Sequence, residues 1–157
     1  MDDSPLLYLS GAEVRRALPI AEAIEAMSTA FARLSEGRVT MPARSRVEVP
    51  EAEGLMLVMP CYAAATGCLS LKLLSQFSRN DSLGLPLIQA LVLLVDADNG
   101  RMLAILDGGA ITALRTGAAS GVATRLLAQP GADTAAIFGA GVQARMQLEA
   151  VCAVRRI

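Results

Sequence analysis

The feature that most constrains the fold of this chain of 157 residues is a series of short β-type runs between residues 46 and 106. Residues 46–49 alternate in polarity, and further runs cover 55–59, 68–77, 87–95 and 101–106. The last two runs are separated by Asp96, Ala97, Asp98, Asn99 and Gly100. Asn-Gly between apolar runs is the strongest short hairpin signal. The pattern therefore predicts a mainly antiparallel sheet in the middle of the chain.

Helical patterns flank this predicted sheet. Ser10 and Glu13 have the spacing of a capping box, which predicts a short helix through residue 17. A second helix is predicted to carry Pro19 in its first turn and to end at Gly37. Its apolar stripe, which we expect to pack against a core, consists of Ile20, Ile24, Met27, Phe31 and Leu34. Residues 108–128 predict one long helix whose small side chains permit close packing. Together these patterns predict an α/β chain.

The C-terminal part combines a strand, a glycine turn and a helix. Residues 134–138 predict a buried strand, and the helix continues toward residue 154. Between them, Gly139, Gly141 and Ala144 match the dinucleotide-binding fingerprint with its permitted alanine. The first glycine allows a tight turn, and the second lets backbone N–H groups approach a pyrophosphate at the helix N-terminus. The alternative is a tight turn that binds nothing.

The fingerprint has one further part, an acidic residue about twenty residues beyond the glycines that binds the ribose hydroxyls. In this chain that position would fall beyond Ile157. The sequence therefore does not distinguish NAD from NADP.

Composition excludes several kinds of site. The chain has no histidine, which excludes Ser-His-Asp and Cys-His nucleophile systems and imidazole-based zinc sites. Fourteen basic and fifteen acidic side chains give a net charge of −1, which argues against nucleic-acid and anionic-membrane partners. Cys61, Cys68 and Cys152 have no CxxC spacing and are odd in number, so we expect neither a disulfide framework nor a metal site. We expect a cytoplasmic protein without an export signal or a membrane span.

Three cations stand out as candidate ligand-binding groups. Arg115 is the only ionised side chain between Asp107 and Arg125, and it borders the apolar face of the predicted long helix. A guanidinium there needs an anion, which is either a protein carboxylate such as Asp107 or a ligand carboxylate or phosphate. Lys72 is predicted to lie on the less apolar face of a strand, and Arg44 in a loop. Solvation is the ordinary alternative for both.

Several segments share a characteristic order and spacing. They are Met41-Pro42-Ala43-Arg44, Leu57-Val58-Met59-Pro60, Leu71-Lys72-Leu73, Asp107-Gly108-Gly109, the run from Ile111 to Ser120, and Gly139-Ala140-Gly141-Val142-Gln143-Ala144. In this combination the chain resembles the N-terminal half of a member of the ornithine cyclodeaminase/mu-crystallin family. The resemblance implies a substrate-binding and dimerisation domain over residues 1–130. Residues 131–157 would then form the first strand and helix of an incomplete Rossmann domain.

The same resemblance implies an activity and a set of roles. Family members use NAD or NADP to remove or add hydride at the α-carbon of a small amino or imino acid, and we expect a homodimer. Arg44, Lys72 and Arg115 would converge on the substrate carboxylate. The cofactor-binding residues would be Arg115, Gly139, Gly141, Val142 and Gln143. The catalytic aspartate of the family would lie beyond Ile157, so we expect this chain alone to be inactive.

One departure bears on the substrate. Leu57 stands where the ornithine-converting branch has an acidic residue, which favours a broader amino-acid dehydrogenase or imine reductase. Two alternatives remain open beside the enzyme hypothesis. The chain could be a non-catalytic module for small-molecule binding or dimerisation, or a truncated gene product whose uncovered strand and helix favour self-association.

Overall fold

The structure, a computed structural model, describes residues 5–157. It has a mixed α/β fold with a mostly antiparallel sheet, which confirms the predicted fold class. The chain forms two compact units, each built from two separate segments. Unit 1 contains the described residues up to Val14 together with residues 37–109, and unit 2 contains residues 15–36 and 110–157.

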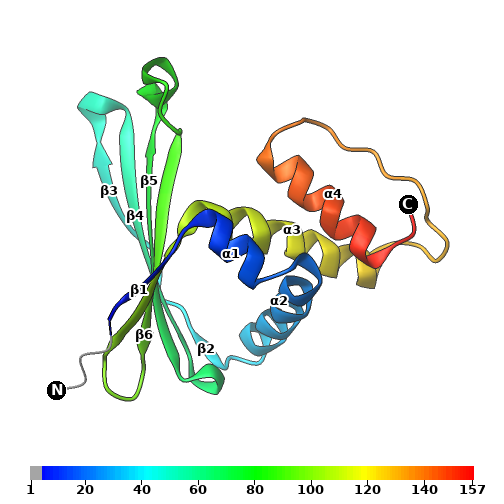
Figure 1. Cartoon of the computed structure of the whole chain (residues 1–157), viewed down its shortest axis with the longest axis horizontal. Coiled ribbons are helices and arrows are strands. Elements are labelled where there is room, and N and C mark those ends of the chain that lie inside the picture. The colour runs from blue at the N-terminus through cyan, green and yellow to red at the C-terminus, as the bar shows by residue number, and fades with distance from the viewer. Residues whose placement is uncertain (1–4) are drawn as a thin grey trace. The chain divides into compact units, whose positions relative to one another are not determined.

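Unit 1 is built on a seven-stranded sheet (Figure 1). Its strands are β1 (Leu7–Leu9), β2 (Val39–Thr40), β3 (Ser45–Val49), β4 (Gly54–Ala63), β5 (Cys68–Phe77), β6 (Ile88–Asp96) and β7 (Met102–Asp107). The order is β1-β7-β6-β5-β4-β2, and β3 also pairs with β4. Among the described strands, only β1 and β7 pair in parallel; the other pairs are antiparallel, as the hairpin signal predicts.

The β6–β7 turn shows why the hairpin prediction holds. The backbone N–H of Asp96 donates to the carbonyl of Arg101 at 2.8 Å, and Gly100 takes a left-handed φ of 78°. A side-chain oxygen of Asp96 accepts the N–H of Asp98, also at 2.8 Å. These are local interactions between near neighbours, so the sequence of the turn is sufficient to specify it.

Strand β4 is longer than the predicted 55–59 run because it continues through Pro60. A proline has no backbone N–H to donate to a neighbouring strand, so the side of the strand that its nitrogen faces must be unpaired at that position. Pro60 meets this condition: on that side of β4, β3 pairs as far as Val58 and β2 begins at Tyr62. Short 3₁₀ turns η1 (Pro50–Ala52), η2 (Ala64–Thr66) and η3 (Ser78–Leu83) connect the strands.

Helix α1 (Gly11–Ala17) begins with the predicted capping box. The backbone N–H of Ser10 donates to the Glu13 carboxylate at 2.8 Å, and the Ser10 hydroxyl donates to the same oxygen at 2.6 Å. The box satisfies an N–H that the helix itself leaves free, and thereby fixes where the helix begins.

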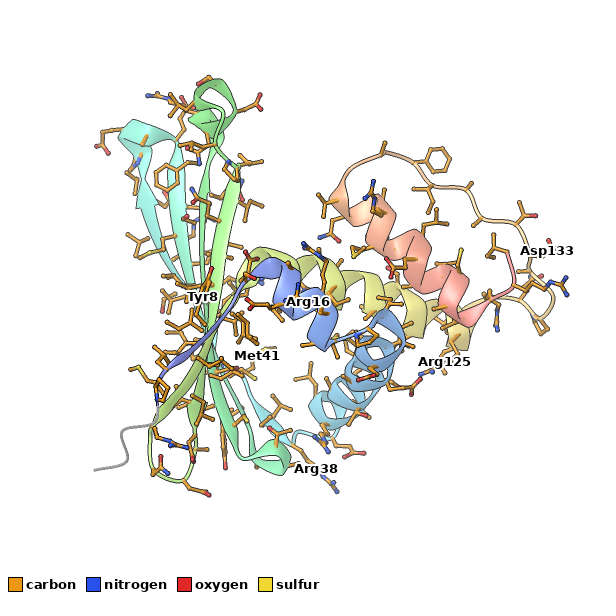
Figure 2. The ribbon with its side chains drawn as sticks, viewed as in Figure 1. Tyr8, Arg16, Arg38, Met41, Arg125 and Asp133 are labelled. Carbon is orange, nitrogen blue, oxygen red and sulfur yellow. The ribbon has the colours of Figure 1, made fainter. Side chains whose placement is uncertain are left out.

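Unit 2 is a packing of α2 (Ile20–Ser35), α4 (Val142–Val154) and the part of α3 (Gly108–Leu127) that begins at Ala110 (Figure 1). Its core consists of Ala23, Ile24, Leu114, Ala118, Val122 and Ala150. Glycines let the helices approach closely. A Cβ on Gly121 would lie 2.9 Å from Cδ1 of Ile24, and one on Gly117 would lie 2.6 Å from the carbonyl oxygen of Met146. At the surface, Arg125 of α3 forms an ion pair with Glu25 of α2 (Figure 2).

Two details of the helix predictions are wrong. Pro19 is the N-cap of α2, one position before the first turn in which we expected it. The apolar stripe of α2 packs only in part, because the core reaches the helix between Ile20 and Met27. Phe31 and Leu34 lie beyond it and are 44% and 43% exposed.

The strand predicted at residues 134–138 is not formed. The segment is irregular, and Phe138 is 97% exposed. A strand requires a neighbour that exchanges backbone hydrogen bonds with it, and none of the described strands pairs with this segment. The following glycine turn and helix α4 form where predicted. Within residues 5–157, no helix is long and apolar enough to cross a bilayer.

We predict that Gly117→Ala destabilises the protein by about 1–3 kcal/mol, because the added methyl group would collide with the backbone of Met146. The measurement is the midpoint of urea unfolding. Gly109→Ala is the matched control, since its Cβ would meet only a carboxylate oxygen of Asp107 at 3.2 Å, and alanine is the better helix former. Equal midpoints for the two variants would contradict the close approach of α3 and α4.

Candidate functional site

The glycine turn in unit 2 has the backbone conformation that a nucleotide-binding turn requires. Gly139 has a φ of 103°, a region that L side chains rarely adopt. Gly141 is the N-cap of α4 in an extended conformation, and its carbonyl accepts the N–H of Arg145 at 3.3 Å. Within residues 5–157, no side chain caps this helix. The first N–H groups of α4 therefore remain available to an anion.

A cavity of about 610 Å³ opens beside this turn. Gly141 and Val142 contribute to its wall, and small residues of α3, Ala110 and Ala113, form another part of it. Arg145 of α4 and Arg15 of α1 also line the cavity. Both arginines are exposed, and neither has an ion-pair partner in the described part of the chain. Two guanidinium groups and a helix N-terminus make the cavity favourable for an anionic ligand.

The turn leaves open space of the kind that the pyrophosphate of a dinucleotide needs. A Cβ on Gly141 would meet no atom within 4 Å, so the space above the turn is open to a ligand. Gln143, in the first turn of α4, has a buried side-chain oxygen that accepts no hydrogen bond in the structure. Gln143 is not among the residues that line the cavity, so this oxygen is not an observed ligand contact.

The cavity also shows what the sequence prediction missed. Of the predicted cofactor residues, Gly141 and Val142 line it, and Gly139 and Gln143 belong to the adjoining turn and helix. Arg15 and Arg145 were not predicted as ligand-binding residues. Arg145 directly follows the fingerprint, and this position could have drawn attention to it. Arg15 had no such signal, because only the fold brings α1 to this cavity.

In unit 1, Arg44 and Lys72 lie at the same position along the strand direction, on either side of β4. Arg44 directly precedes Ser45, which pairs with Val58, and the next residue of β4, Met59, pairs with Lys72. One strand therefore separates the two cations, at a backbone spacing of roughly 10 Å. Arg44 is exposed, and its side chain has no ion-pair partner among residues 5–157.

The surroundings of Lys72 differ from the prediction. We expected a less apolar face of the sheet, but its cross-strand neighbours are Met59 on β4 and Val92 on β6, and its side of the sheet is half-buried. The alternation along β5 alone could not show this, because the apolar neighbours come from other strands. Lys72 is therefore not a fully solvated surface lysine.

Arg115 belongs to unit 2 and lies on α3. Its side chain is exposed and has no ion-pair partner among the described residues, so the protein carboxylate considered as one alternative is not found. It lines a second, smaller pocket of about 80 Å³ with apolar residues of α2 and α3. The convergence of Arg115 with Arg44 and Lys72 stays a prediction.

Cysteines and metal ligands contribute nothing further to the site. Cys61, Cys68 and Cys152 are free thiols. In the described residues, no group of three or more cysteine, aspartate or glutamate side chains is arranged to hold a metal ion.

These features define a class, the α/β proteins in which a mostly antiparallel sheet precedes a glycine turn and helix with the dinucleotide-binding sequence pattern. Comparison with known proteins identifies the family. The chain belongs to the ornithine cyclodeaminase/mu-crystallin family, whose model matches residues 7–157. This confirms the resemblance inferred from the sequence motifs.

The similar proteins are reductases and dehydrogenases. Ketimine reductase mu-crystallin of Mus musculus is 43% identical over 126 residues, which are 80% of this chain and 40% of that protein. The structure of Thermococcus litoralis Delta(1)-pyrroline-2-carboxylate reductase in complex with NADH and L-proline has a TM-score of 0.89 at 43% identity, and the match covers 96% of this chain and 47% of that one. An archaeal alanine dehydrogenase dimer with bound NAD gives a TM-score of 0.89 at 34% identity, over 97% of this chain and 46% of that one. The chain thus spans about half the length of these relatives.

We predict different stability effects for the two glycines of the turn. Gly139→Ala should cost about 1–2 kcal/mol, because alanine is strained at a φ of 103°. Gly141→Ala should change stability by less than about 0.5 kcal/mol, because its φ of −80° suits alanine and its Cβ meets nothing within 4 Å. Chemical denaturation of both variants measures the difference, and the reverse order of stabilities would show that the turn is built differently.

Proposed function

We propose that this chain provides the carboxylate-binding residues and the first part of the nucleotide site of an NAD(P)-dependent enzyme. The enzyme would transfer hydride at the α-carbon of a small amino or imino acid. The observation that carries the proposal is the 610 Å³ cavity at the N-terminus of α4, with its open glycine turn and two arginines that have no ion-pair partner among residues 5–157. Relatives that hold NADH with L-proline, or NAD, support the same conclusion.

The substrate carboxylate is bound by Arg44, Lys72 and Arg115. Support comes from the common level of Arg44 and Lys72 in the sheet and from the absence of an ion pair to Arg115 among residues 5–157. Charge-assisted hydrogen bonds from guanidinium groups would fix the orientation of the carboxylate. A fixed carboxylate holds the neighbouring α-carbon in one place, which is the positioning that hydride transfer needs.

The nucleotide is held by the turn and its surroundings. Backbone N–H groups of Val142 and Gln143 lie at the positive end of α4 and suit a pyrophosphate, while Gly139 and Gly141 keep that approach free of side chains. Arg15 and Arg145, which line the cavity, balance the phosphate charge. Arg115 does not line this cavity and borders the smaller pocket, so its contact with the cofactor is carried by the family resemblance alone. When bound, the nicotinamide of NAD or NADP accepts or donates the hydride.

Residues 1–130 are proposed as the substrate-binding and dimerisation part, and residues 131–157 as the beginning of the Rossmann part. One relative is a dimer, which supports a homodimer for this family member. Three free thiols suit a reducing, cytoplasmic environment. We propose that the 157-residue chain binds ligands without turning them over. Oxidation of an amino acid by this chain at an ordinary enzymatic rate would contradict that.

We predict that Arg115→Gln lowers the affinity for L-proline by about 10- to 100-fold, because it removes a charged hydrogen-bond donor from the carboxylate. Calorimetric titration measures the change. Arg46→Gln is the matched control, since Arg46 is exposed and paired with Glu48 at 2.9 Å. Equal losses in the two variants would indicate a general charge effect and would argue against a specific role of Arg115.

We also predict that Gly141→Ala weakens NADH binding about tenfold or more. Its methyl group would occupy the open space through which a phosphate reaches the N–H groups of α4. The quenching or enhancement of NADH fluorescence on titration measures the affinity. Gly109→Ala, on α3 and outside the cavity lining, is the control. Unchanged NADH affinity in Gly141→Ala would remove the turn from the proposed nucleotide site.

A further inference from the structure

The central strands of the sheet in unit 1 have no buried residues. Every residue of β4, β5 and β6 is half-buried or exposed, although these strands have neighbours on both sides. Among the described residues of unit 1, the buried apolar side chains are those of Val14 and Ala104. A sheet ordinarily buries at least one apolar face against a second layer. Residues 5–157 supply no such layer over these strands.

The two faces of this sheet differ in charge. Successive side chains of a strand point to opposite faces, and paired residues share a face, so the register assigns each residue to one side. Across β3–β6, the ionised side chains of one face are Arg46, Glu48, Lys72 and Asp96. The opposite face has no Asp, Glu, Lys or Arg in these four described strands. We call it the apolar face, and its centre consists of Met56, Val58, Leu71, Leu73, Leu91 and Leu93.

The apolar face has the size that a stable protein interface needs. Strands lie about 4.8 Å apart and side chains on one face repeat about every 6.8 Å, so the positions of β3–β6 on this face cover roughly 500–600 Å² of flat area. The relief of the side chains raises the accessible area toward the ~800 Å² that each partner buries in an interface of standard size. Met56, Leu73 and Leu91 border a hollow of about 390 Å³, which leaves room for side chains of a partner.

A second copy of this chain suits the apolar face better than it suits the charged one. In a two-fold symmetric pair the same patch meets itself, so a charge within the patch would lie close to its own counterpart. The apolar face has no such charge across β3–β6, whereas the other face carries Arg46 and Lys72. Two apolar sheet faces pack about 10 Å apart with interdigitating side chains. A relative with the same fold, the archaeal alanine dehydrogenase, is a dimer.

We propose that two copies of this chain associate through the apolar faces of their sheets, with Leu71, Leu73, Leu91 and Leu93 at the centre of the interface. The inference deepens the proposed function, because it rests on the homodimer proposed there and names the surface that forms it. The face that carries Lys72 stays outside the interface. Association and carboxylate binding therefore use opposite sides of the same sheet.

The test compares two adjacent leucines of β5 that lie on opposite faces. Leu73→Glu places a carboxylate on the apolar face, and Leu74→Glu, the matched control, places one on the other face. Analytical ultracentrifugation of the full chain measures the dissociation constant of the dimer. Leu73→Glu should raise it about 100-fold or more, because the carboxylate loses its water in the interface, and Leu74→Glu should change it less than about threefold. Equal increases in the two variants, or a parent chain that stays monomeric at about 100 μM, overturn the inference.

A second measurement needs no charged substitution. The chain has no tryptophan, so Leu93→Trp on the apolar face and Leu94→Trp on the other face each introduce a single fluorescent reporter. On dilution through the dissociation constant, the emission of Leu93→Trp should shift to longer wavelength as its indole becomes exposed to water. The emission of Leu94→Trp should stay constant. An equal shift in both variants, or a shift in Leu94→Trp alone, overturns the inference.

Titration of Leu73→Glu with NADH separates this inference from the proposed function. Strand β5 contributes no residue to the lining of the cavity at α4, so the monomeric variant should bind NADH as the parent chain does. A parent chain that is monomeric and binds NADH overturns the association and leaves the nucleotide site. A parent chain that forms the dimer and binds no NADH overturns the proposed function and leaves the interface.

Discussion

The close approach of α3 to its neighbouring helices is the constraint on which unit 2 depends. Gly117 brings α3 against the backbone of Met146 on α4, and Gly121 brings it against Ile24 on α2. Dispersion contacts weaken steeply with separation, so helices that meet without intervening side chains gain contacts along their whole crossing. Other small residues of these helices border the empty spaces: Ala113 of α3 lines the larger cavity and Ala26 of α2 lines the smaller one. Small side chains in unit 2 thus allow both close helix packing and open space beside the helices.

A helix of small residues also limits where charge can be placed. On α3 the described ionised side chains are Arg115 and Arg125, and they differ in surroundings. Arg125 is paired with Glu25, which is an ordinary exposed contact of modest value. Arg115 has no such partner in the described chain and lies at the edge of an apolar pocket. Two arginines on one helix therefore differ in their surroundings, because the neighbouring helix supplies a carboxylate to Arg125 and, among the described residues, none to Arg115.

The sequence predicted those parts of the structure that depend on near neighbours. The hairpin at Asn99 and Gly100, the capping box at Ser10 and the left-handed turn at Gly139 are each specified within a few residues, and each forms as predicted. The failures depend on distant partners. A strand at residues 134–138 needs a paired strand, and the burial of Phe31 needs a surface against which to pack. The position of Arg15 beside the larger cavity was missed for the same reason, because it depends on the fold and not on neighbouring residues in the sequence.

Arg44 and Lys72 lie on either side of β4 at a separation that costs little stability, and the two positive charges together favour an anionic ligand. Arg44 and Lys72 are separated by β4, and at roughly 10 Å in water two like charges repel by only about 0.4 kcal/mol. The fold can therefore hold Arg44 and Lys72 at the same position along the strands with little loss of stability. An anion placed between them interacts with each at about half that distance, in surroundings made less polar by Met59 and Val92, so both attractions exceed the repulsion. This balance is the physical basis for proposing a carboxylate here, beside two cations whose backbone positions are set by the register of β3, β4 and β5.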